Sequence, residues 1–267
     1  MKSYLSYFNL KFKTGLQYRA AAYAGIATQL FFGIIYTSVY IAFYESNASN
    51  YPMELNKLIS FLWLNQAFFS LMYLWHKDKD ILAIIKNGNI AYELCRPQDL
   101  YLMWASKILG ERLSMVTLRF LPVLIFALLL PFPYKLILKT SIPFFLLSII
   151  ALVLSTFLST FLILLCHIIC MFTLDEKGIV NIFMVTADIL SGLVIPIPFF
   201  PSFLQKISNI LPFRYVSDFP FRLYVGDINI REGIIGIIIQ LIWIIILVII
   251  GRILSKRALR KAVIQGG

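Results

Sequence analysis

The strongest constraint in the sequence is a series of long apolar blocks, rich in Ile, Leu and Phe and separated by short polar segments. A block of about 20 residues wound into a helix can cross the hydrocarbon core of a bilayer, which is about 30 Å thick. Hydrophobic residues make up 60% of the chain and charged residues 14%, a balance that excludes an ordinary soluble domain. The blocks also lack the alternating pattern of outer-membrane strands. The chain is therefore predicted to be an all-α integral membrane protein.

Six of the blocks are long enough to be spans, and we predict a single transmembrane domain over residues 1–267. Polar segments and prolines set the limits of the spans at 20–44, 58–75, 113–130, 142–174, 178–200 and 233–253. Residues 1–19 mix aromatic and aliphatic side chains with lysines, which is typical of an amphipathic helix on the membrane surface. The sequence thus predicts one surface helix followed by six spans.

The segments between the spans differ in character. Residues 76–112 are too long and too polar for a turn, and we expect a helical cytoplasmic loop there. Residues 201–232 are partly apolar but are interrupted by Pro212 and Pro220, which favours two short external helices that re-enter the membrane edge. Residues 254–267 are expected to form a basic cytoplasmic tail.

The basic residues, which give the chain a formal charge of +11, indicate its orientation. A charge of this size raises the question of nucleic acid binding. Most Lys and Arg residues flank the spans, however, and the larger share lies on the side that holds both termini. The positive-inside rule then places both termini in the cytoplasm, and no nucleic acid partner is expected.

The sequence contains no set of residues suited to catalysis or metal binding. None of its glycines forms the GxxxxGK loop, followed by Ser or Thr, with which ATPases hold phosphate. Cys166, His167 and Cys170 are too few for a metal site and are expected to pack or to line a polar interior. We therefore expect no catalytic, cofactor or metal site in this chain, so that a separate subunit would bind any ATP and Mg²⁺.

Two charged residues inside the predicted spans, Arg119 and Asp188, are functional candidates because a charge is costly to bury in lipid. They pair with each other, face a wet cavity or make local contacts, and the sequence leaves these alternatives open. Further polar residues inside the spans are Gln29, Asn65, Gln66 and Gln240. Such groups often hydrogen bond between helices and are expected to hold the bundle together.

Four segments carry a resemblance to a known family. They are LQYRAAAYAGI, NGNIAYELCRPQDLYLMWASKILGE, GLVIPIPFFPSFLQKISNILPFRYVSDFPFRLYVGDI and QLIWIIILVIIGRILSKRALRKAVIQGG. In their order and spacing they resemble ABC transporter permeases of the type-2 exporter class, in the six-span group that ends in a basic tail and two glycines. The resemblance covers nearly the whole chain and implies a multi-pass protein of the bacterial cytoplasmic membrane.

The resemblance also implies a coupling helix within residues 76–112, which would seat in a groove of an ATPase subunit. The residues that would form it are Lys86, Asn87, Gly88, Asn89, Ile90, Leu94, Arg96 and Pro97. Gly88 and Pro97 are placed to bracket a short helix, and its mixed polar and apolar surface suits docking. The alternative is a surface helix that rests on lipid headgroups. By the same resemblance, the N-terminal surface helix would make a second contact with the ATPase.

The proline-rich external segment resembles the paired re-entrant helices that cap the translocation path in this class. Its candidate gate residues are Phe199, Phe200, Phe203, Leu211, Pro212 and Phe213. Apolar side chains of this kind expel water when they close together. Anchoring of aromatic residues at the membrane interface is the competing interpretation.

The resemblance implies an exporter in which two permeases, identical or related, work with two ATPase subunits. Its cargo would be a hydrophobic or amphipathic molecule such as a peptide, a drug or a lipid-like compound, and its surroundings would be membrane lipid. Two other classes of function stay open from the residues themselves. These are a membrane-embedded lipid-modifying enzyme and a noncatalytic immunity or sequestration protein.

Overall fold

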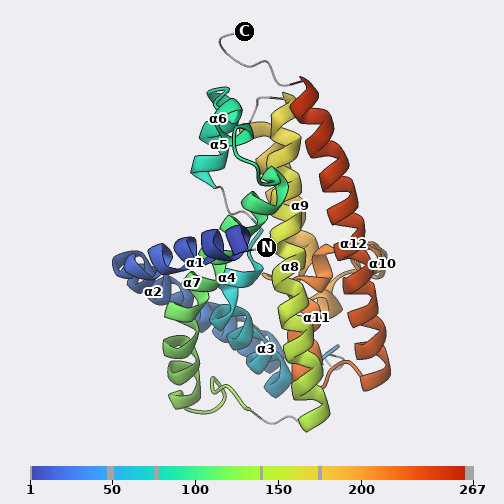
Figure 1. Ribbon diagram of the computed structural model, residues 1–267. Coiled ribbons are helices and arrows are strands. Elements are labelled where there is room, and N and C mark those ends of the chain that lie inside the picture. Colours follow the sequence, from blue (N-terminus) through green and yellow to red (C-terminus); the bar gives the residue numbers. More distant parts are fainter. Residues whose placement is uncertain (1, 47–50, 75–77, 139–140, 174–175, 262–267) are drawn as a thin grey trace.

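The computed structural model describes the chain except for residues 1, 47–50, 75–77, 139–140, 174–175 and 262–267 (Figure 1). Every regular element in this described part is a helix. Four of the helices are long and apolar enough to cross a membrane, namely α2 (Arg19–Glu45), α7 (Leu100–Leu129), α8 (Ile142–Thr173) and α12 (Ile230–Lys261). The all-helical fold is therefore confirmed, and four of the six predicted spans correspond to helices of sufficient length.

The second and fifth predicted spans correspond to shorter helices. The second is divided into α3 (Leu55–Ala67) and α4 (Phe69–Met72), with the break at Phe68. The fifth corresponds to α9 (Glu176–Ser191), which stops before Gly192. Gly192 has a φ of +73°, a left-handed conformation that ends helices and that glycine adopts without steric cost. Passage of these two segments across a membrane stays a prediction.

Two long helices begin or end outside their predicted limits. α7 begins at Leu100 rather than at 113, because Asp99 caps it by accepting a hydrogen bond from the backbone of Leu102 at 3.0 Å. α12 continues past 253 to Lys261, since the basic segment after the apolar block is made of good helix formers. Residues 100–112, expected within a loop, are thus part of a span-length helix.

α8 lies at the centre of the bundle and runs beside α12 for most of its length (Figure 1). Small polar residues on α8 allow close approach of its neighbours. The hydroxyl of Ser155 donates to the carbonyl of Tyr215 at 2.8 Å, and that of Ser159 donates to the carbonyl of Leu71 at 2.9 Å. α8 therefore joins elements that are far apart in the sequence.

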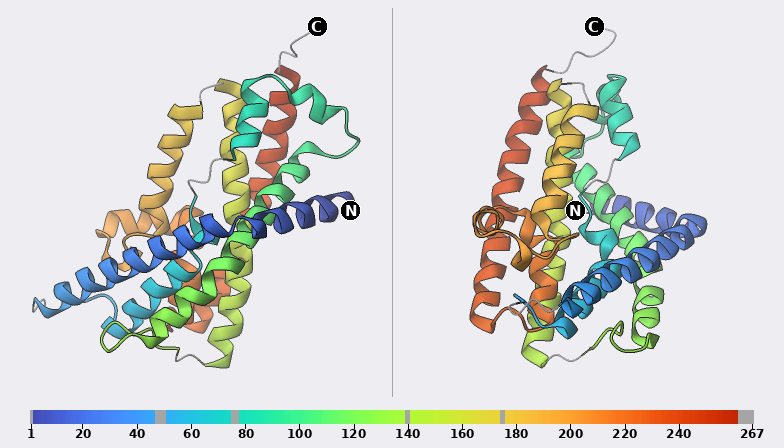
Figure 2. Two further views of the ribbon diagram at one scale, coloured as in Figure 1. Left: turned by 90° about the vertical axis from the view of Figure 1, so that its left-hand side faces the viewer. Right: turned by 180° about the vertical axis from the view of Figure 1, so that it is seen from behind.

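α1 (Lys2–Gln17) lies across α7, at a large angle to α8 and α12 (Figures 1 and 2). The crossing depends on Gly110 of α7, where an added Cβ atom would lie 2.8 Å from the carbonyl oxygen of Phe8. Tyr4, Phe8 and other residues three to four apart are half-buried on this side, whereas Leu5 is 62% exposed on the other. The amphipathic helix predicted for residues 1–19 thus turns one stripe of its apolar residues toward α7.

The remaining elements are short helices grouped in two places. They are α5 (Lys79–Lys86), α6 (Ile90–Leu94), η1 (Ile197–Phe199), α10 (Ser202–Ile210), η2 (Phe213–Tyr215) and α11 (Asp218–Tyr224). α5 and α6 lie at the end of the bundle where α12 ends, whereas α10 and α11 lie beside the middle of α8 and α12 (Figures 1 and 2). α10 and α11 correspond to the two short helices expected within 201–232.

Candidate functional site

The helix pair α5–α6 carries most of the predicted coupling residues at one end of the molecule. Gly88, with a φ of +67°, turns the chain between the two helices. α6 lies between Gly88 and Pro97, as the sequence predicted. On α6, Tyr92 is 76% exposed and Leu94 is 44% exposed, although both are largely apolar. An exposed apolar surface on a short helix at the end of a membrane bundle is suited to contact with another protein.

The other coupling candidates surround this surface. Lys86, Asn87, Asn89, Arg96 and Pro97 are exposed, Gly88 is partly buried and Ile90 is buried. Arg96 forms an ion pair with Glu93 at 3.3 Å, within α6 and the turn that follows it. Burial of Ile90 fixes α6 to the bundle, and the exposed residues are left for a partner or for lipid headgroups.

A buried ion pair anchors α5 to α7. Asp78 caps α5, and its Oδ1 accepts hydrogen bonds from the backbone of Asp80 and Ile81 at 3.0 Å each. The same oxygen accepts a hydrogen bond from Lys107 Nζ at 2.6 Å, and both side chains are nearly inaccessible to solvent. We call Asp78, Asp80 and Lys107 the Asp78 cluster. It ties the start of the coupling segment to a span-length helix.

Two further contacts extend the Asp78 cluster to α8 and α1. The backbone N–H of Asp78 donates to Nε2 of His167 at 3.2 Å, while Nδ1 of His167 lies 2.8 Å from the carbonyl of Ile163. A neutral imidazole with its proton on Nδ1 satisfies both contacts. Asp80 lies 2.8 Å from Lys107 Nζ and 3.8 Å from Lys11 Nζ of α1. α1, α5, α7 and α8 are therefore joined by one group of polar contacts.

Asp80 is the exposed member of the cluster. Its hydrogen bond and charge interaction with Lys107 hold the pKa of the Asp80 carboxyl below its usual value. Its side chain is 69% exposed, so water screens much of this interaction. The main contribution to holding α5 in place therefore comes from the buried Asp78.

Arg112 stabilises the end of α4, where the helical part of the second predicted span stops. Its guanidinium is fully buried, and Nη2 donates to the carbonyls of Leu71 and Tyr73 at 2.5 and 2.8 Å. These carbonyls lie at the end of α4, where they have lost their helical partners. The guanidinium also lies over the ring of Tyr73, 5.1 Å from its centroid. A buried arginine thus supplies hydrogen bonds to carbonyls at the end of α4.

The structure does not bring Arg119 and Asp188 together as a pair. Arg119 Nη2 donates to the carbonyl of Ala21 in α2 at 3.0 Å, and its guanidinium lies against Gly25. Asp188 instead lies at a cavity of about 240 Å³ between α2, α9 and the break of α3 and α4. Gln29 and Gln66 line the same cavity. Of the alternatives left open by the sequence, Asp188 faces a cavity, whereas Arg119 makes a local contact with the backbone of α2.

Asn65 and Gln240 hydrogen bond between elements. Asn65 accepts a hydrogen bond from the hydroxyl of Ser217 at 2.8 Å. The amide nitrogen of Gln240 donates to the carbonyls of Ala151 and Tyr215 and to the hydroxyl of Ser155, at distances of 2.9 to 3.1 Å. These bonds join α3, α8 and α12 to the segment around α11, which is the role expected of polar groups inside a bundle.

The gate candidates occupy different surroundings. Phe199 contacts Tyr40 and Phe43 of α2, with ring centroids 5.4 and 6.4 Å apart, whereas Phe213 contacts Phe183 of α9. Phe203 is 63% exposed. Phe200 and Pro212 are buried and Leu211 is partly buried. The six residues therefore belong to several local contacts, and a gate formed by them stays a prediction.

A second buried ion cluster holds the segment around α11. Asp218 is fully buried, its Oδ1 accepts a hydrogen bond from the backbone of Ile197 at 3.2 Å, and its Oδ2 lies 3.2 Å from Arg222 and 3.6 Å from Arg214. Arg222 also pairs with Asp227 at 2.7 Å. These contacts fix η1 against α11 and so set the shape of the segment that holds the gate candidates.

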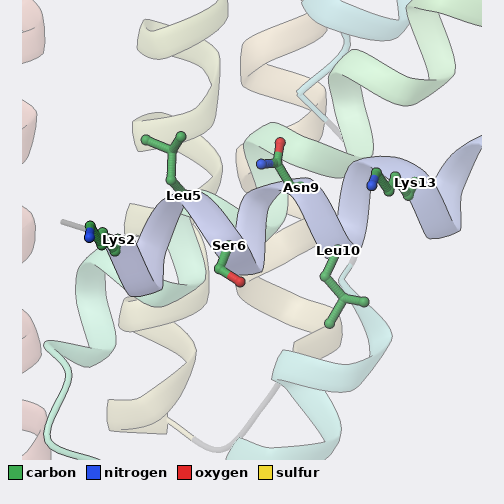
Figure 3. Close-up of a pocket in the computed structure, with 6 residues that line it drawn as sticks. All are labelled: Lys2, Leu5, Ser6, Asn9, Leu10 and Lys13. Carbon is green, nitrogen blue, oxygen red and sulfur yellow. The ribbon is translucent and has the colours of Figure 1, made fainter.

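The face of α1 that points away from α7 forms a shallow depression lined by a single helix (Figure 3). Its residues are Lys2, Leu5, Ser6, Asn9, Leu10 and Lys13. Leu5 and Leu10 are 62% and 57% exposed between basic and polar neighbours. This composition suits either contact that the sequence suggested for α1, with lipid headgroups or with an ATPase subunit.

Sequence reasoning missed Asp78, Lys107, Arg112 and Asp218. The first three fall in the segment assigned to a cytoplasmic loop, where charged residues are usually solvated. The spacing of Lys107 and Glu111, one helical turn apart, was an available signal that this segment is helical. The burial of Arg112 and Asp218 depends on contacts with distant elements, for which the sequence carries no local signal.

The long apolar helices define the class of protein, which is a multi-pass helical membrane protein. Residues 54–266 match the family model described as ABC-2 family transporter protein. The match covers most of the chain, so the chain belongs to this family and is a transport subunit of the permease type. No curated protein and no solved structure matches the chain.

Proposed function

We propose that this chain is the permease subunit of an ATP-driven exporter, which moves a hydrophobic or amphipathic molecule out of the cell with the help of a separate ATPase. Membership of the ABC-2 transporter family supports the proposal. The observation that carries it is the exposed α6, whose neighbour α5 is anchored to three other helices through the Asp78 cluster. Such an element transmits the movement of a docked partner into the bundle.

The working complex would hold two permeases, identical or related, and two ATPase subunits in a bacterial cytoplasmic membrane. The ATPase would bind ATP and Mg²⁺ and would receive α6 on its surface, with both termini of the permease on the same side. A force on α6 reaches α7 through Lys107, α8 through His167 and α1 through Lys11. Because the buried Lys107–Asp78 pair resists separation, α5 and α7 move together between inward-facing and outward-facing arrangements, and the weaker contacts through His167 and Lys11 extend the movement to α8 and α1.

Affinity purification of the full chain from its native membrane tests this proposal, with identification of the bound proteins and measurement of ATP hydrolysis. We expect an ABC-type ATPase to co-purify, and Tyr92→Ala or Arg96→Glu to reduce the amount recovered about tenfold or more, since hot-spot residues at interfaces contribute about 2 kcal/mol or more. Tyr23→Ala is the matched control, because Tyr23 is a similarly exposed aromatic residue on α2.

Recovery of the chain without any ATPase would contradict the exporter proposal and favour a lipid-modifying or sequestering role. Recovery of an ATPase in equal amounts with the Tyr92 and Arg96 variants would leave the exporter intact but would remove α6 as its docking element.

A further inference from the structure

The cavity beside Asp188 combines apolar walls with a small polar floor. It lies between α2, α9 and the break of α3 and α4 and has a volume of about 240 Å³. The residues that line it include Gln29, Phe32, Tyr36, Phe69, Asp188 and Val194. A cavity of this size is smaller than the sites of drug-sized ligands, which occupy about 300 to 1,000 Å³. It has room for one end of an elongated molecule.

Gln29 is the buried polar group that this cavity leaves without a partner. Its side chain is 3% exposed, and neither its amide oxygen nor its amide nitrogen has a hydrogen bond partner among the residues that the structure describes. A buried amide without hydrogen bonds is unfavourable, because its polar atoms have lost water and gained no partner. Such a group in a cavity wall is suited to a ligand that supplies the missing bonds.

Asp188 gives the cavity its charge. Its carboxylate is partly buried, and within the described ranges no basic side chain forms an ion pair with it. Arg119 of α7, the basic residue that the sequence suggested as its partner, donates instead to the carbonyl of Ala21. A carboxylate in apolar surroundings attracts a cation and repels an anion.

We propose that this cavity binds the amine end of a hydrophobic molecule, whose ammonium group pairs with Asp188 and hydrogen bonds to Gln29. The aromatic rings of Phe32, Tyr36 and Phe69 add walls that attract both cations and alkyl groups. Phe32 and Val194 are 41% and 42% exposed at the rim, so the apolar remainder of the molecule lies outward between the helices. This inference rests on the proposed function, because it assigns the cavity to the transported molecule.

The test uses the purified full chain in nanodiscs of zwitterionic lipid, with empty nanodiscs as the background. The probe is dansylcadaverine, a fluorescent primary amine that is protonated at pH 7, and its comparator is the uncharged N-acetyl derivative. We expect the amine to bind about tenfold more tightly than the acetylated probe, as a charge-assisted hydrogen bond in a desolvated site allows.

Asp188→Asn, which keeps the shape of the side chain, is expected to abolish this preference while the affinity for the acetylated probe changes less than about twofold. Asp188→Glu, which keeps the charge, should retain a preference for the amine. Glu54→Gln removes an exposed acid far from the cavity and should behave as the unmodified protein.

Equal binding of the two probes by the unmodified protein, or a preference that survives Asp188→Asn, would overturn the inference. The result is independent of the ATPase. If an ATPase co-purifies but Asp188→Asn has no effect on probe binding, the amine site is wrong and the exporter proposal stands. If the amine binds through Asp188 but no ATPase co-purifies, the amine site stands and the exporter proposal is wrong.

Discussion

Two acids of this protein, Asp78 and Asp188, have opposite surroundings. Asp78 is 3% exposed, and its Oδ1 receives two backbone hydrogen bonds and the ammonium of Lys107. Asp188 is partly buried and has no ion pair among the described residues. An acid that is neutralised inside the chain stabilises the fold, whereas an acid that is left unpaired beside a cavity is suited to a ligand. The contrast separates a structural charge from a binding charge without reference to family.

The largest effect should come from removing the partner of the structural acid. Lys107→Met leaves Asp78 buried and uncompensated, and we expect the free energy of unfolding to fall by about 3 to 5 kcal/mol. Denaturant titration in detergent micelles measures this change. The double variant Lys107→Met with Asp78→Asn should regain much of the loss, because Asn still caps α5 without carrying a charge. A double variant no more stable than the single one would show that Asp78 is not the group left uncompensated.

A smaller loss is expected when the end of α4 loses its hydrogen bonds to Arg112. Arg112→Met leaves the carbonyls of Leu71 and Tyr73 without the guanidinium, which should cost about 2 to 3 kcal/mol. The same titration measures it, and Arg96→Met, at an exposed arginine, is the matched control. An unchanged stability of the Arg112 variant would mean that other groups satisfy these carbonyls.

The binding acid should show little effect on stability. Asp188→Asn removes a charge that has no ion pair in the described chain, and we expect the free energy of unfolding to stay within about 0.5 kcal/mol of that of the unmodified protein or to rise. A loss of more than about 2 kcal/mol would break the comparison, because it would show that Asp188 stabilises the fold as Asp78 does.

A further small effect concerns pH. The pKa of Asp80 is lowered in the folded protein by Lys107, so its contribution is present above the unfolded pKa and is lost as pH falls through the folded pKa. Because its side chain is 69% exposed, we expect a contribution below about 1 kcal/mol. The free energy of unfolding, measured from pH 6 down to pH 3, should fall more steeply for the unmodified protein than for Asp80→Asn. Identical slopes would contradict the assignment.

The long helices were predictable because length and hydropathy are local properties of the sequence. The fourth predicted span, 142–174, nearly coincides with α8. The limits of α7 and α12 were less predictable, since caps such as Asp99 and the helix-forming basic tail extend helices beyond the apolar blocks. The end of α4 at Met72 had no local signal, because the arginine that hydrogen bonds to the carbonyls there lies on another helix.

The candidate site was predictable only in part. Gly88 and Pro97 indicated the position of α6 through their effect on the backbone, which acts locally. The sequence also marked Asp188 and Gln66 as polar positions in spans, but their meeting at one cavity depends on the packing of α2 and α9. The contact of Lys107 with Asp78 arises from tertiary structure, which one sequence does not reveal, whereas Asp218 and Arg222 pair within α11 at a spacing of four residues that the sequence does show.

The crossing of α1 over Gly110 has a consequence for the biogenesis of the protein. The ribosome completes α1 long before it completes the part of α7 on which α1 lies, so the N-terminal helix has no docking surface during the early stages of synthesis. Its basic and apolar residues allow it to bind to the surface of the bilayer during this interval. α1 then packs on α7 once α7 has been inserted. The final contacts of the start of the chain therefore form only after later segments have been synthesised.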